Sequence, residues 1–247
     1  MPQLSRTDKD EYALVQRRLA ACDWPTLEDS LWKHGYARTP QVLTEEECAT
    51  LIAIYTESER FRKTINMERH RFGVGEYKYF AAPLPPLVQA LRTSLYPPLA
   101  AIANRWMQAL RLSEHFPPDL QAFLAQCHER GQTKPTPLLL HYEAEGYNCL
   151  HQDLYGEIAF PLQFVCFLSQ PGKDYDGGEF LLVEQQPRAQ SRGMAISPRQ
   201  GEGLIFTTRF RPMPSKRGYA RAQMRHGVSR VTSGSRYTLG IIFHDAQ

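Results

Sequence analysis

The first half of the chain places apolar residues at the spacing of amphipathic helices. Thr44 and Glu47 form a capping-box sequence, in which each side chain can accept a hydrogen bond from the other residue's backbone N–H. The apolar residues that follow recur at i, i+3, i+4 and i+7, namely Cys48, Leu51, Ile52 and Tyr55. This combination predicts a helix that begins directly after Thr44.

Two further helices are predicted before residue 135. One starts after Pro85-Pro86 and continues to Leu110, and we expect Pro97-Pro98 to interrupt it because a proline ring clashes with the preceding turn. The other runs from about Pro118 to Glu129, with its apolar residues on one face. We expect only one or two strands in this half of the chain.

From Pro137 onward the hydrophobic pattern changes to short apolar and aromatic runs. They cover residues 138–142, 160–168, 179–183, 203–207 and 237–243. Turn-forming sequences separate them, among them Glu145-Gly146, Pro171-Gly172 and Ser233-Gly234. Short strands at this spacing are typical of a double-sheet barrel or jelly roll. We therefore expect an α+β protein with a jelly-roll core (a double-stranded β-helix) and N-terminal helices packed on one sheet.

Length and composition favour a single globular domain. The 247 residues, 42% of them hydrophobic, can bury a sizeable core, and no repeat or linker divides them. We expect one domain over residues 1–247, with a helical part to about residue 135 and the jelly-roll core from about 136 to 247. No apolar run reaches the ~18 residues of a membrane span, and the charged N-terminus has no apolar signal region. The five scattered cysteines indicate reduced thiols in a cytoplasmic protein.

Positive charge is concentrated in one segment. The net charge is only +3, yet the stretch from Gln185 to Arg236 holds eleven Lys and Arg residues and a single acid, Glu202. That segment carries +10, which leaves −7 for the rest of the chain. Such asymmetry favours an anionic partner for one face of the molecule, and the alternative is a loop of solvated arginines.

Three residues have the types and the spacing of ligands for a non-haem iron. His151 and Asp153 are two residues apart, so on a strand their side chains would point to the same face. His226 follows Asp153 by seventy-three residues and would complete the set from a distant strand. Two imidazoles and one carboxylate form the facial triad that leaves open coordination positions on Fe(II).

The residues around this triad indicate a second component of the site. Arg236 lies inside an apolar run, where a cation needs an anionic partner, and a dicarboxylate co-substrate bound to the iron would supply one. Thr238 shares a strand face with Arg236, and Tyr142 precedes His151 by nine residues. A tight turn, Asp176-Gly177-Gly178, lies between the ligands in sequence.

This ordered set resembles the Fe(II)/2-oxoglutarate dioxygenase superfamily over roughly residues 137 to 243. The stretch YEAEGYNCLHQD, from Tyr142 to Asp153, looks like the corresponding stretch of the AlkB-type nucleic-acid demethylases. The chain as a whole is most similar to the bacterial Oxygenase-NA family, an AlkB-like oxygenase family of damaged nucleic acid. The segments that carry this likeness are residues 75–80, 103–106, 135–140, 148–156 and 225–228.

The resemblance implies an enzyme with two cofactor components. His151, Asp153 and His226 would hold Fe(II) as metal ligands and catalytic residues, while Arg236 would bind the distal carboxylate of 2-oxoglutarate with help from Tyr142 and Thr238. The reaction would consume O2 and 2-oxoglutarate and release succinate and CO2. Hydroxylation of an N-methyl base would give a product that loses formaldehyde.

Two positions depart from the AlkB-type pattern. Leu140 stands where those enzymes carry an Asn, and Ile242 stands where they carry a second Arg. Both family residues help to hold 2-oxoglutarate. Asn148 and Gln163 are the candidate polar replacements in this chain.

The basic segment 188–230 is the candidate nucleic-acid surface. Basic residues that neutralise phosphates alternate there with aromatics that can stack on bases. The candidate substrate residues are Arg209, Arg211, Arg217, Arg221 and Tyr219. The alternative is an arginine-rich structure that clamps the barrel to the helices. A polar stretch with His70, Arg71 and Tyr77 is a second candidate substrate loop.

Three functions are compatible with the sequence. The first is a dioxygenase that hydroxylates or demethylates alkylated bases in nucleic acid. The second is a prolyl-hydroxylase-like enzyme that hydroxylates a protein or amino-acid side chain, since the Gly-Gly-Glu turn and the helices before the barrel are also common there. The third, a non-catalytic iron or 2-oxoglutarate sensor, is the least favoured because the ligand set is complete.

Overall fold

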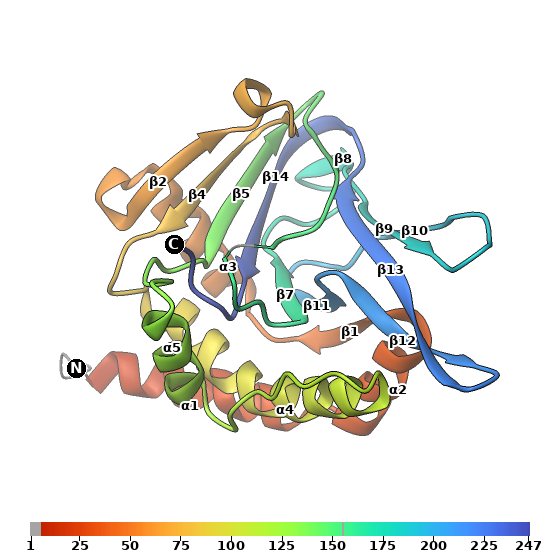
Figure 1. Cartoon of the computed structure of the whole chain (residues 1–247). Helices are drawn as coiled ribbons and strands as arrows, with labels where there is room; N and C mark the ends of the chain where they lie inside the picture. Colours follow the sequence, from red (N-terminus) through yellow and green to blue (C-terminus); the bar gives the residue numbers. More distant parts are fainter. Residues whose placement is uncertain (1–5, 155) are drawn as a thin grey trace.

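Two antiparallel sheets form the body of the protein, and a computed structural model describes residues 6–154 and 156–247 of it (Figure 1). The major sheet has the strand order β1 (Tyr36–Gln41), β11 (Glu202–Thr207), β7 (Leu162–Phe167), β14 (Val231–Ile241), β5 (Leu138–Glu143), β4 (Glu76–Phe80) and β2 (Phe61–Asn66), with β8 (Tyr175–Gly177) paired to β14. The minor sheet has the order β10 (Arg192–Ile196), β9 (Phe180–Gln185), β13 (Gly218–Val228), β6 (Tyr147–His151) and β3 (Gly73–Val74), with β12 (Phe210–Ser215) paired to β13. This is the expected jelly-roll arrangement.

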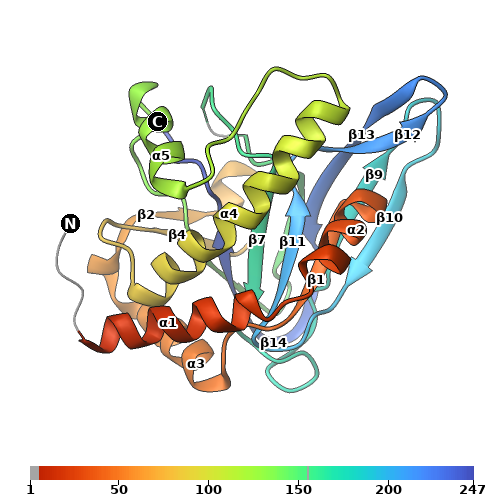
Figure 2. The same ribbon diagram turned by 90° about the horizontal axis from the view of Figure 1, so that it is seen from below.

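The helices cover the outer face of the major sheet, as expected. Figure 2 shows α1 (Arg6–Ala20), α2 (Trp24–His34) and α4 (Pro86–Ala109) lying across it, and α3 (Glu45–Ala53) and α5 (Leu120–Glu129) complete the helical layer. Three short 3-10 helices are η1 (Ile54–Thr56), η2 (Ser58–Arg60) and η3 (Glu68–His70). Within the described residues, no helix is both long enough and apolar enough to cross a membrane.

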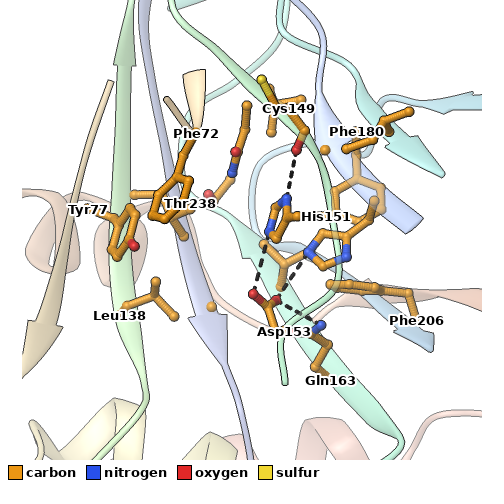
Figure 3. Close-up of a pocket in the computed structure, with 18 of the residues that line it drawn as sticks. Phe72, Tyr77, Leu138, Cys149, His151, Asp153, Gln163, Phe180, Phe206 and Thr238 are labelled. Carbon is orange, nitrogen blue, oxygen red and sulfur yellow. Dashed lines mark hydrogen bonds and ion pairs between the residues drawn. The ribbon is translucent and has the colours of Figure 1, made fainter. Parts of the chain in front are cut away.

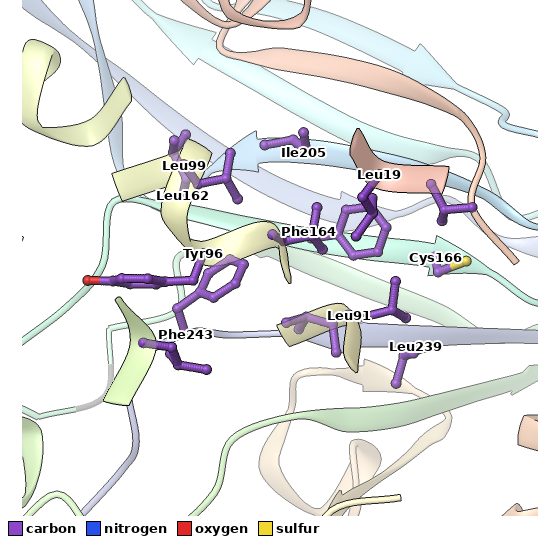
Figure 4. Close-up of a cluster of buried hydrophobic side chains, with 14 of the residues drawn as sticks. Leu19, Leu91, Tyr96, Leu99, Leu162, Phe164, Cys166, Ile205, Leu239 and Phe243 are labelled. Carbon is purple, nitrogen blue, oxygen red and sulfur yellow. The ribbon is translucent and has the colours of Figure 1, made fainter. Parts of the chain in front are cut away.

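Strand β7 is buried along its whole length because it has a packed layer on each side. Phe164 and Cys166 point toward the helices, where they meet Leu19, Leu91 and Leu99 (Figure 4). Val165 and Phe167 point the other way and pack against residues of the minor sheet. The alternation of side chains along a strand thus produces two hydrophobic layers from one central strand.

The predicted interruption at Pro97-Pro98 is wrong, because α4 continues through both prolines. A proline in a helix interior costs about 3 kcal/mol. Leu95, Tyr96 and Leu99 are fully buried on the two sides of the prolines. Burying each such side chain stabilises by roughly 1.5–3 kcal/mol, so packing of the helix against the sheet outweighs the local cost.

Other expectations agree with the structure more closely. The capping box is confirmed, since the Thr44 N–H donates to Glu47 and the Glu47 N–H donates to the Thr44 hydroxyl, and α3 begins at the next residue. The helix predicted to end at Glu129 is α5. The first half holds four strands, β1 to β4, rather than one or two, and all four pair within the two sheets.

A buried ion pair joins α4 to the C-terminal end of the chain. Arg92, 3% exposed, donates to the carbonyls of Ile242 and Phe243 and to Asp245, 2.8 Å from its carboxylate oxygen. We predict that Arg92→Ala lowers the free energy of unfolding by about 3–5 kcal/mol, because it takes the arginine from the buried Asp245 carboxylate and leaves only the exposed His128 beside it. Urea denaturation measures this change. Arg111→Ala, at an exposed position after α4, is the control, and an equal loss in both variants would contradict the prediction.

Candidate 2-oxoglutarate and iron site

The three predicted metal ligands come together between the sheets (Figure 3). His226 on β13 pairs directly with His151 on β6, so the two imidazoles lie side by side with ring centroids 4.2 Å apart. Asp153 lies 3.5 Å from His151 Nε2 and 3.2 Å from His226 Nε2. One ligand atom from each residue lies within 4.8 Å of the others. This spacing suits coordination of one metal ion by all three residues.

The route by which Asp153 reaches the site differs from the expectation. Strand β6 ends at His151, and Asp153 lies in the loop beyond it, so the two side chains do not share a strand face. Gln152, between the two ligands, donates to the carbonyls of Arg209 (3.1 Å) and Met224 (2.7 Å). These hydrogen bonds fix the loop that directs Asp153 inward.

Neighbouring groups orient the ligands. The Nδ1–H of His151 donates to the Cys149 carbonyl at 2.7 Å, which leaves Nε2 free to bind a metal. Gln163 donates to Asp153 Oδ2 at 3.0 Å. The ring of Phe180 is stacked on the His226 imidazole with an interplanar angle of 8°, and the ring of Phe206 meets the same imidazole edge-on. These contacts hold the donor atoms in place before any ion is bound.

The electrostatics favour the metal-binding forms of Asp153 and His226. Burial alone would raise the pKa of Asp153, but the charge of His226 and the hydrogen bonds from both imidazoles hold it well below the usual value. Burial and the neighbouring His151 lower the pKa of His226. Burial would also lower the pKa of His151, but the hydrogen bond to Asp153 and the charge of Asp153 raise it. A metal ion needs an ionised carboxylate and neutral imidazoles, so the shifts at Asp153 and His226 favour metal binding, whereas the shift at His151 favours its protonated form.

Arg236 on β14 stands out among the buried arginines of the described residues. Arg92 pairs with Asp245 and Arg211 pairs with Glu184, but Arg236, which is 1% exposed, forms no ion pair. Its Nε and Nη1 have no hydrogen-bond partner. A buried guanidinium with unused donors is costly unless an anion completes it.

Aromatic rings surround the Arg236 guanidinium. Its central carbon lies 5.4 Å from the Phe167 ring, 5.5 Å from the Tyr142 ring and 5.8 Å from the Tyr175 ring. Gly178 makes room for the side chain, because a Cβ at this position would lie 2.8 Å from Arg236 Cδ. The rings restrict the guanidinium to one place, and a carboxylate there would accept from its planar edge.

One cavity connects the metal ligands with Arg236. It has a volume of about 400 Å³ and is lined by all six predicted metal and co-substrate residues, namely His151, Asp153, His226, Arg236, Tyr142 and Thr238. Burial raises the pKa of Tyr142 to about 12, so its hydroxyl stays protonated, and it accepts from Asn148 at 3.3 Å. Leu140 and Ile242 also line the cavity, so the two departures from the AlkB-type pattern make part of its wall apolar.

The residues fit both implied groups. Two histidines and one aspartate suit Fe(II) and leave coordination positions for other ligands. The unpartnered donors of Arg236 suit the distal carboxylate of 2-oxoglutarate. Gln163 was a candidate to replace the Asn with which AlkB-type enzymes help to hold 2-oxoglutarate. Its side-chain amide already donates a hydrogen bond to Asp153.

The predicted substrate residues do not line this cavity. Arg211 is 6% exposed and donates to Glu184 and to the Trp32 carbonyl of α2, so it clamps the barrel to a helix as the alternative interpretation proposed. Tyr219 is 45% exposed and packs on Trp32 with ring centroids 5.4 Å apart. Arg209, Arg217 and Arg221 are exposed at the surface.

Strand β13 explains why the arginines and the metal ligand separate. Met224 and His226 are buried on its inner face, whereas Arg221 and Arg225 alternate with them and are exposed on the outer face. The basic segment therefore leads to His226 in sequence but faces away from it in space. A strand prediction across residues 218–228 would have revealed this.

The sequence interpretation missed the roles of several residues around the site. Phe180 was assigned only to a strand, and Phe206 was counted among the aromatics of the basic segment, but both lie beside His226. Tyr175, beside Arg236, carried no signal except its place before the Gly-Gly turn. Arg71 and Tyr77, from the second candidate substrate loop, do line the cavity, together with Phe72 between them in sequence.

A jelly-roll barrel that gathers this triad and an unpaired buried arginine around one cavity defines a 2-oxoglutarate- and Fe(II)-dependent oxygenase. The sequence matches the Oxygenase-NA family over residues 75–246, and that family is described as an oxygenase catalysing oxidative methylation of damaged DNA. The chain therefore belongs to the Oxygenase-NA family.

The chain is also similar to curated proteins over most of its length. Two uncharacterised proteins of Mycobacterium tuberculosis, MT2286 and Rv2227, are each 46% identical over 195 residues, which cover 77% of this chain and 83% of the relative.

Among solved structures, a Burkholderia pseudomallei oxidoreductase of the 2OG-Fe(II) oxygenase family has a TM-score of 0.54 at 13% identity, covering 90% of this chain and 92% of its own. A Pseudomonas putida prolyl-4-hydroxylase has a TM-score of 0.52 at 14% identity, and the match covers 91% of this chain and 99% of the hydroxylase. At such identities the likeness concerns the fold.

We predict that His151→Ala and His226→Ala each abolish Fe(II) binding and turnover while the fold survives, because each removes one of only three protein ligands. Metal content after desalting measures binding, and far-UV circular dichroism reports the fold. His115→Ala, which removes an exposed histidine, is the matched control. Full iron occupancy in either ligand variant would show that the metal is held elsewhere.

We predict that Arg236→Met raises the 2-oxoglutarate concentration for half-maximal turnover by about 10- to 100-fold, since a hydrogen bond to a charged group contributes about 1.5–3 kcal/mol. Without 2-oxoglutarate, the thermal midpoint should change little, because the lost contacts with the aromatic rings are offset by removal of a buried charge whose Nε and Nη1 have no hydrogen-bond partners. Stabilisation by added 2-oxoglutarate should disappear. Arg230→Met, at an exposed arginine, is the control. An unchanged 2-oxoglutarate requirement in Arg236→Met would contradict the assignment of Arg236 as the residue that binds 2-oxoglutarate.

Proposed function

We propose that this oxygenase hydroxylates or demethylates an alkylated base in nucleic acid and releases succinate and CO2. The family description, which names damaged DNA, supports a nucleic-acid substrate. The charge distribution beside the site supports it independently. The free cysteines fit a reducing compartment, and we propose a cytoplasmic location.

The observation that carries the proposal is a basic surface without acidic partners. Seven exposed residues form it: Arg188, Arg192, Arg209, Lys216, Arg217, Arg221 and Arg225. In the described part of the chain, none of the seven forms an ion pair, whereas the nearby Arg211 and Arg230 do. Unpaired cations on one side of a protein attract a polyanion and release its counterions on binding.

One residue of this basic surface is attached to the loop that carries the candidate metal ligands. Gln152 lies between His151 and Asp153 and donates to the Arg209 carbonyl. Arg221 lies over the Phe210 ring at 5.1 Å, which fixes a cation farther along the same surface. Phosphates bound there would keep the polymer close to the cavity while a base enters it.

Each part of the cavity has a role in this function. Bound Fe(II) and 2-oxoglutarate would supply the oxidising chemistry. His151, Asp153 and His226 would hold the metal, and Arg236 would orient the co-substrate by binding the distal carboxylate of 2-oxoglutarate. Phe180 and Phe206 exclude water around His226, and the protonated Tyr142 hydroxyl provides a hydrogen-bonding group beside Arg236.

The second candidate is hydroxylation of a protein or amino-acid side chain. The exposed side chains at the cavity mouth are largely apolar, which also suits a peptide. The fold likeness to a Pseudomonas putida prolyl-4-hydroxylase points in the same direction. The basic surface has no evident use in this candidate, and for that reason we place it second.

We predict that N-methylated oligonucleotides stimulate succinate formation more than unmethylated ones, and that binding weakens steeply with salt because phosphate contacts release counterions. The double variant Arg217→Gln/Arg221→Gln should lower the slope of log affinity against log salt by roughly 1–2 and leave the 2-oxoglutarate requirement unchanged.

Lys173→Gln, which removes an exposed charge outside the basic surface, is the control. Salt-independent binding, or stimulation by prolyl peptides and not by any methylated oligonucleotide, would contradict the proposed function.

A further inference from the structure

Exposed apolar side chains gather beside the metal ligands. The described residues include six large exposed hydrophobic side chains, and two of them, Phe72 and Leu150, line the cavity. We call these two the apolar rim. Leu150 lies on β6, directly before His151. An exposed apolar cluster at a cavity mouth marks a contact surface for a ligand.

The backbone holds Phe72 firmly in this position. Its N–H donates to the Met67 carbonyl at 3.0 Å, and its carbonyl accepts from the Cys149 N–H at 2.8 Å. Met67 is fully buried, and its N–H donates to the Gly75 carbonyl at 2.9 Å. The loop between Met67 and Gly75 is therefore closed on itself and attached to the strand that carries His151.

The sequence encodes this attachment through Gly73. Its φ is +141°, a conformation that side chains disfavour, and a Cβ there would lie 2.2 Å from the Tyr147 carbonyl oxygen. Only glycine allows β3 to approach β6 this closely. The close approach places the preceding residue, Phe72, at the mouth of the cavity.

The Phe72 ring is available for stacking. His70 covers it from one side, with ring centroids 5.3 Å apart and an interplanar angle of 20°, yet 47% of Phe72 stays exposed. Figure 3 shows Phe72 and Tyr77 on the side of the cavity across from His151 and Asp153. A planar group entering toward the metal would meet the Phe72 ring on its way.

We propose that Phe72 determines substrate specificity by stacking on the planar ring of the target base as it enters the cavity. The inference rests on the proposed function and assigns the base-binding contact to the N-terminal half of the chain. Stacking on an aromatic side chain replaces the neighbouring bases that the target loses when it leaves the strand. Arg71, exposed and also lining the cavity, adds a cation beside the ring for a flanking phosphate.

This arrangement divides recognition between two surfaces. The basic surface, whose Arg221 and Arg225 lie on the outer face of the minor sheet, would bind phosphates without reading the base. The apolar rim would contact the base and has Arg71 as a neighbouring cation. Loss of Phe72 should therefore weaken productive entry of the base much more than it weakens binding of the polymer.

The test compares Phe72→Leu, which keeps an apolar side chain, with Phe72→Tyr, which keeps the ring. The first readout is the KM for an N-methylated oligonucleotide in the succinate assay. Phe72→Leu should raise it by about 5- to 100-fold, the range expected for loss of one base–aromatic stack, and Phe72→Tyr should stay within about threefold of wild type. The KM for 2-oxoglutarate should be unchanged in both variants.

The second readout is the fluorescence of an oligonucleotide that carries 2-aminopurine, whose emission falls when the base stacks. Wild type and Phe72→Tyr should quench it on binding, whereas Phe72→Leu should bind the same oligonucleotide with little quenching. Leu14→Ala, which removes an exposed apolar side chain from α1, is the control for general loss of surface hydrophobicity.

The outcomes separate the two proposals. Equal KM values and equal quenching in Phe72→Leu and wild type would overturn the role of Phe72 while leaving the proposed function intact. Succinate formation stimulated by prolyl peptides and by no methylated oligonucleotide would overturn the proposed function, and the stacking inference with it.

Discussion

The antiparallel pairing of β6 with β13 is the contact on which the site depends. It sets His226 opposite His151, although the two residues are far apart in sequence, and it leaves Asp153 on the loop that follows. A shift of one residue in this register would turn every inner side chain of β13 to the outside. Met224 and Ala222, buried on the same face as His226, resist such a shift because their burial would be lost.

The second constraint is the treatment of positive charge in the interior. Arg92 and Arg211 are paired with buried carboxylates and join helices to the barrel. Arg236 has the same burial without an acidic partner, and aromatic rings surround it instead. Such a cation is stable enough to persist in a folded protein, yet it retains donors for a carboxylate. What lies beside each buried arginine thus distinguishes the two structural arginines from Arg236, the candidate for binding a carboxylate.

The minor sheet separates two tasks by the alternation of its strands. The inner face of β13 carries a metal ligand, and its outer face carries Arg221 and Arg225. The cavity mouth itself is formed largely by apolar residues of β6 and by the loop that ends at Gly73. Exposed cations and exposed apolar side chains therefore occupy different parts of the molecule, and the proposed function assigns the polymer to the first and its base to the second.

The sequence by itself determined the local elements and the candidate ligands. The capping box at Thr44, the strand periodicity after Pro137 and the residue types of His151, Asp153, His226 and Arg236 all depend on short-range patterns that the structure reproduces. These features could be predicted because helix capping, strand alternation and metal chemistry act through neighbouring residues or through residue type alone.

Only the tertiary structure decided what those residues contact. It kept α4 helical through Pro97-Pro98 because packing outweighed the local preference, and it turned Arg211 into an internal clamp while leaving Arg236 unpaired. It also moved the basic segment to the outer face and brought Phe72 from the N-terminal half to the cavity. Burial and long-range strand register set these outcomes, and neither is encoded in the spacing of residues along the chain.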